Sequence, residues 1–175
     1  MARLAADGVE SVRVELLARD LHVSKGSFYW HFRDREELLG KILSHWESEQ
    51  DAGLSSCAEQ AAARRWAAFV EQNSAEEWVR RELGIRSWAR KDAKVAALVA
   101  AADDKKRRFI AEVLTDIGFG SSAANSWADV MLLVWLGWLD RAANQAGPEA
   151  KRSSLSDVLS KIVLAASEQL SDEKP

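Results

Sequence analysis

The sequence predicts an all-α protein, on three observations. Strong helix formers dominate the chain, whereas only two prolines and one tyrosine occur in its 175 residues. Helix starts and stops recur, and the apolar residues between them follow helical spacing. No hairpin dipeptide or strand-like alternation interrupts the pattern. We therefore expect about nine helices, arranged as a small N-terminal unit, residues 1–45, on a larger bundle, residues 46–175.

Capping patterns and glycines mark the expected helix ends. An N-cap acceptor followed three residues later by an acid predicts a helix start. This pattern occurs at Asp34/Glu37, Ser56/Glu59, Ser74/Glu77 and Ser154/Asp157. Helix stops are predicted at Gly8, at Gly118 and Gly120, and at Gly147–Pro148.

Residues 15–32 have the spacing of a helix-turn-helix. Residues 15–21 predict a short helix with one apolar face, and residues 22–23 predict a tight turn. Ser24 is a good N-cap for the next helix, in which Phe28 and Phe32 lie one turn apart and point inward. Two short helices held at a fixed angle by such a turn are typical of DNA-binding heads.

The outward side of this second helix is unusual for a surface that meets only water. It offers two aromatic rings, hydroxyl groups, a lysine and a histidine, and such surfaces are rare unless something docks there. DNA accounts for each member, because Lys25 and Ser27 could bond base edges and Tyr29 could touch a thymine methyl group. Phosphate oxygens could accept from other donors nearby. The candidate DNA-binding residues are Ser24, Lys25, Gly26, Ser27, Tyr29, Trp30, His31 and Arg35.

The run LLARDLHVSKGSFYWHFRDREELL resembles the helix-turn-helix of TetR-family transcriptional regulators. The resemblance covers roughly residues 8–43. It implies a recognition helix over residues 24–32, and it places Arg35 where the family commonly has a basic residue at the next helix start. The chain departs from the family pattern at Arg13, where a capping threonine is usual, and at His22, where the turn usually has glycine. Histidine tolerates a positive φ better than most residues.

The start of the chain departs from the family as well. The family's first helix normally begins upstream of the position that matches Met1, and a basic arm often precedes it. The first helix is therefore expected to be truncated in this sequence, and either the recorded start is too late or the protein binds DNA weakly. Lys and Arg balance Asp and Glu, seven each, over residues 1–45, and the whole chain carries a formal charge of −3. DNA binding would then depend on a few well-placed cations.

The helix that begins at Asp34 carries an apolar stripe, Leu38, Leu39, Ile42, Leu43 and Trp46, which can join the head to the bundle. The resemblance implies that residues 46–175 sense a ligand and form a dimer. Aromatic residues there either fill the core or line an apolar pocket between helices. The candidate ligand-binding residues are Trp66, Phe69, Trp78, Trp88 and Phe109, with Gln72 and Asn125 as possible polar anchors.

Two amphipathic stretches are candidates for the dimer interface. Residues 127–138 are apolar on more than one face, which predicts burial on more than one side. Their run VMLLVWLGWL is about half the length that a membrane span needs, so we expect no membrane association. The resemblance implies a four-helix contact between two copies of the chain. Its expected members are Trp127, Val130, Met131, Val134, Gly137, Trp138, Leu155, Val158, Leu159, Ile162 and Val163.

Other classes of protein find little support. Cys57 is the only cysteine, which excludes an intrachain disulfide and suits the cytoplasm. It is either a passive thiol or a redox sensor. The three histidines lack metal-ligand spacing, and there is no phosphate-binding loop or nucleophile elbow. We expect no enzymatic activity, no catalytic residues, no cofactor and no metal.

The sequence thus predicts a ligand-responsive regulator that binds double-stranded operator DNA as a homodimer. A small apolar or amphipathic effector would bind one spacing of the two reading heads better and release a repressor from its operator. The alternative is a helical ligand-binding dimer whose DNA binding is impaired or lost.

Overall fold

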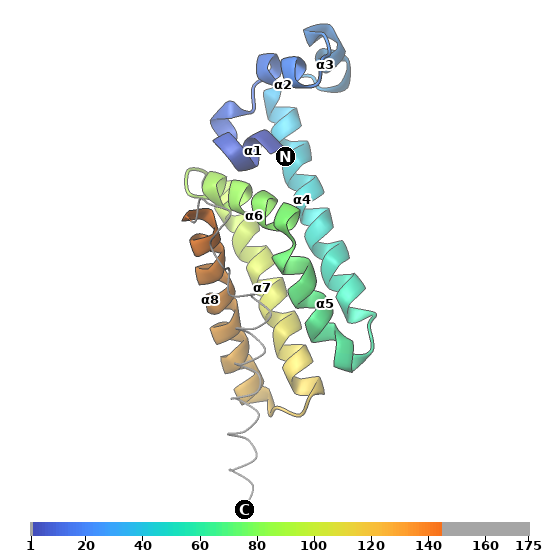
Figure 1. The fold of residues 1–175 in the computed structure, drawn as a ribbon, viewed down its shortest axis with the longest axis vertical. Coiled ribbons are helices and arrows are strands. Elements are labelled where there is room, and N and C mark those ends of the chain that lie inside the picture. The colour runs from blue at the N-terminus through green and yellow to red at the C-terminus, as the bar shows by residue number, and fades with distance from the viewer. Residues whose placement is uncertain (1, 145–175) are drawn as a thin grey trace, which may run out of the picture. The chain divides into compact units, whose positions relative to one another are not determined.

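The structure, a computed structural model, describes residues 2–144 (Figure 1). Those residues form eight α-helices and one 3₁₀ helix and contain no strand, so the predicted all-α class is confirmed for them. The helix expected near residues 154–170 and the stop at residues 147–148 lie outside the described residues. The elements are α1 (Ala2–Asp7), η1 (Val9–Ser11), α2 (Val14–Asp20), α3 (Lys25–His31), α4 (Arg35–Ala58), α5 (Ala62–Ser74), α6 (Glu76–Ala89), α7 (Ala93–Asp116) and α8 (Ser121–Asn144).

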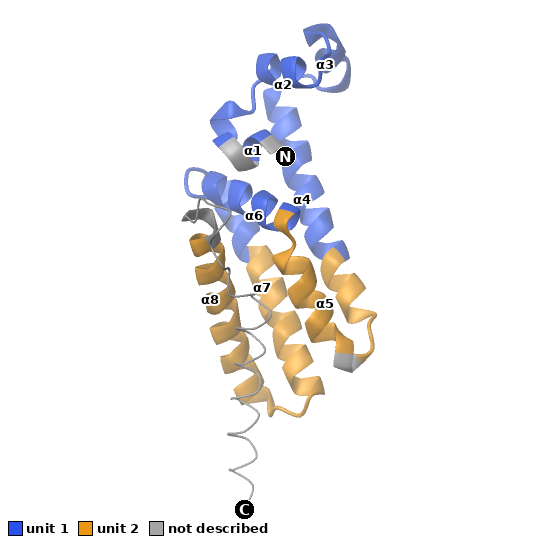
Figure 2. Cartoon of the chain, viewed as in Figure 1, with its two compact units in different colours: residues 1–52, 77–100 blue, residues 53–76, 101–175 orange. Residues whose placement is uncertain are grey.

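The chain divides into two compact units (Figure 2). Unit 1 comprises residues 1–52 and 77–100, and so contains α1 to α3, most of α4 and α6, and the start of α7. Unit 2 comprises residues 53–76 and the residues from 101 onward. It contains α5, the rest of α7 and α8. The boundary near residue 45 that the sequence predicts lies within α4.

One of the predicted capping pairs forms, and two do not. The Asp34 carboxylate accepts from the Glu37 N–H at 2.8 Å, and the Glu37 carboxylate accepts from the Arg33 N–H at 2.9 Å. The predicted start at Ser56 is wrong, because α4 runs through it to residue 58. A helix does begin beside Ser74, because α6 starts at Glu76, but Ser74 does not cap it, since its hydroxyl donates back to the Glu71 carbonyl at the end of α5.

Two helices end in the same left-handed turn. At the end of α7, Gly118 has φ 106°, and the Phe119 N–H reaches the Leu114 carbonyl at 3.0 Å. At the end of α2, His22 has φ 55°, and the Val23 N–H reaches the Ala18 carbonyl at 2.9 Å. This pairing is the Schellman motif, in which glycine is usual. The positive φ expected at residue 22 is therefore confirmed.

Each unit has its own apolar core. In unit 1, Leu4, Val12, Val14, Ala18, Phe28 and Leu39 are buried around the head, and Trp46, Val79, Ile85, Trp88, Val95 and Val99 are buried farther along. In unit 2, helices α5, α7 and α8 lie side by side (Figure 1) and bury Phe69, Phe109, Leu114, Met131, Trp135 and Leu139. None of the helices within residues 2–144 combines the length and apolar content that a bilayer span requires.

Candidate nucleic-acid interface

Helix α3 is held in place by its cap and by one buried ring. The Ser24 hydroxyl oxygen accepts from the Ser27 N–H at 3.1 Å, which satisfies a free donor of the first turn. Phe28 is buried and packs against Phe32, with ring centroids 5.1 Å apart. Because Phe28 anchors the inner side of so short a helix, the opposite side faces away from the core.

All of the candidate DNA-binding residues except Arg35 lie on that exposed helix or at its cap. Tyr29 is 54% exposed and Trp30 is 82% exposed, which is exceptional for rings of this size. Trp30 and His31 meet edge to face, with centroids 4.7 Å apart. Ser24, Lys25, Gly26 and Ser27 are exposed as well. The arrangement presents aromatic surface, hydroxyl groups and one cation together, which is what base-edge contacts in a major groove require.

Lys25 already has a partner within the head. Its ammonium lies 3.1 Å from the Glu15 carboxylate of α2, and both side chains are well exposed. The pKa of Glu15 is lowered, mainly by the backbone N–H at the start of α2 and next by Lys25. An exposed pair of this kind contributes little to stability. Lys25 can therefore exchange Glu15 for a DNA acceptor at small cost.

The structure places Arg35 differently from the other candidates. Its guanidinium is part-buried and donates to the Val12 carbonyl at 2.7 Å and to the Val9 carbonyl at 2.6 Å. Arg35 thus links the start of α4 to η1. Arg13, at the N-cap of α2, makes no side-chain cap and donates instead to the Glu10 carbonyl at 3.0 Å. Neither contact could be predicted from the sequence, because Val9 and Val12 are distant from Arg35 in the chain and Glu10 lies in a short 3₁₀ helix.

The five candidate ligand-binding residues are divided between the two units. Trp66, Phe69 and Phe109 form a stacked column in unit 2, with centroid separations of 5.9 and 5.3 Å. Trp78 and Trp88 belong to unit 1. Trp88 is buried, and Trp78 lies beside the Arg81 guanidinium, 5.9 Å from the ring centroid. Only the unit 2 column brings candidates together.

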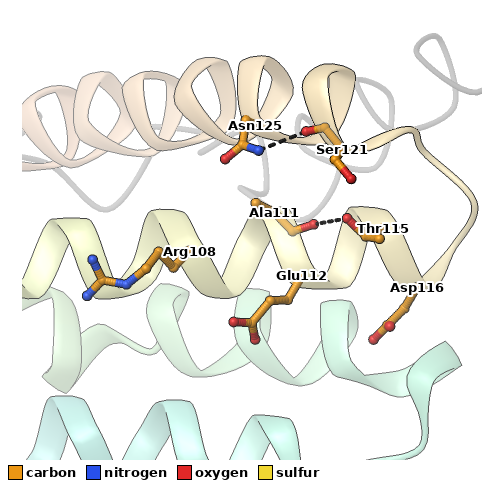
Figure 3. Close-up of a pocket in the computed structure, with 7 residues that line it drawn as sticks. All are labelled: Arg108, Ala111, Glu112, Thr115, Asp116, Ser121 and Asn125. Atoms are coloured by element: carbon orange, nitrogen blue, oxygen red, sulfur yellow. Dashed lines mark hydrogen bonds between the residues drawn. The ribbon is translucent and has the colours of Figure 1, made fainter.

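An open surface pocket of about 370 Å³ lies between α7 and the start of α8 (Figure 3). None of the five candidates lines it, whereas Asn125 does. Its polar groups are largely engaged, since Thr115 donates to the Ala111 carbonyl and Asn125 donates to the Ser121 carbonyl. Figure 3 shows the side chains of Arg108, Glu112 and Asp116 pointing away from Asn125 rather than converging. The remaining lining residues are Ala111, Thr115 and Ser121.

The candidate dimer residues of α8 fall on different sides of the helix. Val130 is 41% exposed, Gly137 is exposed, and Trp127, Val134 and Trp138 are half-buried. Met131 is only 1% exposed, because it faces the core of unit 2 with Trp135 and Leu139. It is therefore removed from the surface that a second chain could contact. Leu133, at 67%, is the more exposed apolar residue beside Val130. Leu155, Val158, Leu159, Ile162 and Val163 lie outside the described residues.

A buried carboxylate in unit 1 escaped the sequence interpretation. Glu82 of α6 is 1% exposed and accepts from the Trp46 indole at 3.1 Å and from the Gln50 amide at 2.9 Å, both on α4. Arg86 donates to its other oxygen at 2.8 Å. From the sequence, a glutamate in an amphipathic helix is expected to face solvent. The partners of Glu82 lie on another helix, so only the tertiary structure identifies them. These hydrogen bonds connect α6 to α4, the helix that follows the head.

Comparison with known proteins gives one match. Residues 1–42 match the family model described as "Bacterial regulatory proteins, tetR family". The matched range contains α1 to α3 and the start of α4, together with every candidate DNA-binding residue. No curated protein and no solved structure matches the chain.

Proposed function

Because this chain is a TetR-family DNA-binding transcriptional regulator, and so belongs to a family of regulators rather than enzymes, we propose that it is a repressor released from its operator by a small amphipathic molecule. The exposed side of α3 carries the proposal. Trp30 and Tyr29 expose large ring surfaces beside Lys25 and Ser27. Apolar surface of this kind is uncommon on a helix that contacts only water, and it marks a site where a partner binds. We assign base contacts to Lys25, Ser27 and Tyr29 and phosphate contacts to Trp30 and His31.

The DNA assignment is tested with an operator selected from random DNA. Tyr29→Ala should reduce the ratio of operator to non-specific affinity by about 10- to 100-fold, because one base contact contributes about 1–3 kcal/mol of discrimination. Tyr29→Phe keeps the ring and should retain most of the discrimination. Lys94→Ala removes an exposed charge at the start of α7, outside the head, and serves as the control.

Fluorescence anisotropy at several salt concentrations supplies the readout. Specific binding that weakens steeply with salt supports the regulator. An equal loss of operator and non-specific affinity in Tyr29→Ala would remove Tyr29 from the base contacts. A wild-type chain that selects no sequence at any salt concentration would favour the helical ligand-binding dimer without DNA binding.

We propose further that the chain acts as a homodimer through the exposed side of α8. Val130 and Leu133 are large apolar residues at its surface, and Gly137 beside them has no neighbouring atom within 4 Å of the Cβ position among the described residues. A two-fold dimer also places two recognition helices on half-sites about one helical turn apart. Leu133→Asp should shift the chain toward monomer in sedimentation experiments, whereas Leu21→Asp, equally exposed but in the head, should not. Dimers unaffected by Leu133→Asp would place the interface elsewhere.

The effector would enter unit 2, where buried aromatic residues lie on three neighbouring helices. Binding there would change operator affinity only if the ligand favours one conformation of the dimer over the other. Loss of operator binding on addition of a ligand, reversed by its removal, is the expected observation. Ligands that bind without changing operator affinity would contradict the repressor mechanism.

A further inference from the structure

The lysine of helix α3 is paired with a glutamate from the neighbouring helix. The Lys25 ammonium lies 3.1 Å from a carboxylate oxygen of Glu15 on α2. Both helices belong to unit 1, and they pack against each other (Figure 1). The two side chains are 60% and 59% exposed. Because Lys25 is a candidate base contact, Glu15 places a carboxylate at the edge of the proposed DNA-binding surface.

This carboxylate offsets the charge that Lys25 presents to DNA. The pKa of Glu15 lies below its ordinary value, first because of the backbone N–H at the start of α2 and next because of Lys25, so the group is ionised at neutral pH. Helix α3 contains no other lysine or arginine. A phosphate that approaches Lys25 therefore also meets a negative charge, which weakens the attraction. Binding to DNA of any sequence should be weaker than a free lysine would allow.

An ammonium group that is bound on one side by Glu15 still has donors for a base. Lysine offers three N–H donors, and Glu15 accepts one of them. The major-groove edge of guanine presents two neighbouring acceptors, O6 and N7, whereas adenine presents one acceptor beside an amino donor. The guanine edge carries no net charge, so the Glu15 carboxylate does not repel it as it repels a phosphate. A held lysine with two remaining donors therefore matches guanine.

We propose that Glu15 is a positioning residue for sequence discrimination, which holds the Lys25 ammonium toward the guanine of a G·C pair and away from phosphates. Without the carboxylate, the flexible lysine side chain could turn to the nearest phosphate instead. Glu15 thus lowers the affinity for all DNA and raises the preference for one base pair. This inference rests on the proposed function and deepens it, because it names the base that one residue of the site reads.

The test begins with operators selected from random DNA by the full chain and by Lys25→Met. The base-pair position at which Lys25→Met loses its preference is the position that Lys25 reads. We expect guanine at this position in the wild-type operator. Its preference over the other bases should fall by about 10- to 100-fold in Lys25→Met, as for the loss of one base contact.

Glu15→Gln keeps the size of the side chain and removes its charge. It should lower the guanine preference at this position by about 2- to 5-fold, which is the range expected for an exposed ion pair. The affinity for non-specific DNA should rise, and its salt dependence should steepen by about one counterion, because Lys25 becomes available to a phosphate. Glu36→Gln removes an exposed charge of the same sign at the start of α4 and is the matched control, which should leave the guanine preference unchanged.

The double variant Glu15→Gln/Lys25→Met shows whether Glu15 acts through Lys25. In the Lys25→Met background, Glu15→Gln should have no further effect on this base preference, whereas a merely structural role would give the same loss in both backgrounds. An operator without a guanine that depends on Lys25, or a Glu15→Gln variant that behaves like Glu36→Gln, would overturn the role of Glu15 and leave operator binding in place. A wild-type chain that selects no sequence would overturn the proposed function and this inference with it.

Discussion

Removing the guanidinium of Arg35 should lower the stability of the head and not only its affinity for DNA. Arg35 donates at 2.7 Å to Val12 and at 2.6 Å to Val9. A hydrogen bond from a charged donor contributes about 1.5–3 kcal/mol. Because Arg35 is part-buried and water can replace some of the contact, we take the lower end for both bonds. Arg35→Ala should then lower the free energy of unfolding by about 2–3 kcal/mol.

Denaturant titration followed by circular dichroism measures this loss, because unfolding of the head removes helical signal. Arg33→Ala is the matched control, since the Arg33 side chain is 82% exposed and pairs only with the neighbouring Asp34 among the contacts of the described residues. Its change should stay within about 0.5 kcal/mol. Arg35→Lys cannot reach two carbonyls with one planar group and should recover only part of the loss. If Arg35→Ala unfolded like the wild type while DNA affinity fell, a phosphate contact would replace this account.

Three further predictions concern single residues. His22→Gly should stabilise the chain by about 0.5–1 kcal/mol in thermal unfolding, because the left-handed φ of 55° strains any residue with a Cβ; a loss would show that the imidazole makes a contact of its own. Glu82→Ala should cost about 3 kcal/mol by leaving buried donors of α4 without an acceptor, whereas the exposed Glu112→Ala should cost almost nothing in the same denaturant titration. The backbone N–H of Glu37 lowers the pKa of the Asp34 carboxyl. The contribution of this cap to stability is therefore complete above the ordinary carboxyl pKa and is lost as the pH falls through the lowered pKa. An acid titration of Asp34→Asn followed by circular dichroism should lack this loss of stability, and a transition identical to that of the wild type would refute the assignment.

Local chemistry made the head predictable. Ser24 caps α3, Phe28 fills the inner side, and His22 occupies a left-handed turn, as expected from spacing and residue type. Each of these features depends on atoms within a few residues of one another. The absent caps at Ser56 and Ser74 show the limit of such patterns, because a serine and an acid three residues on also occur inside and at the ends of longer helices.

The sequence alone therefore determined the fold class, the helix-turn-helix and the exposed side of α3, because helical spacing and caps act over short distances. Tertiary structure alone decided which polar residues are buried. In the folded chain Arg35 donates to the Val12 carbonyl, and Glu82 of α6 accepts from Gln50 of α4. Lys106 and Asn73 both lie beside the Trp135 indole. Such contacts join residues far apart in the chain, and a single sequence carries no local sign of them. The exposed side of α3, its cap and its buried ring could therefore be predicted from the sequence, whereas the long-range contacts of Arg35 and Glu82 could not.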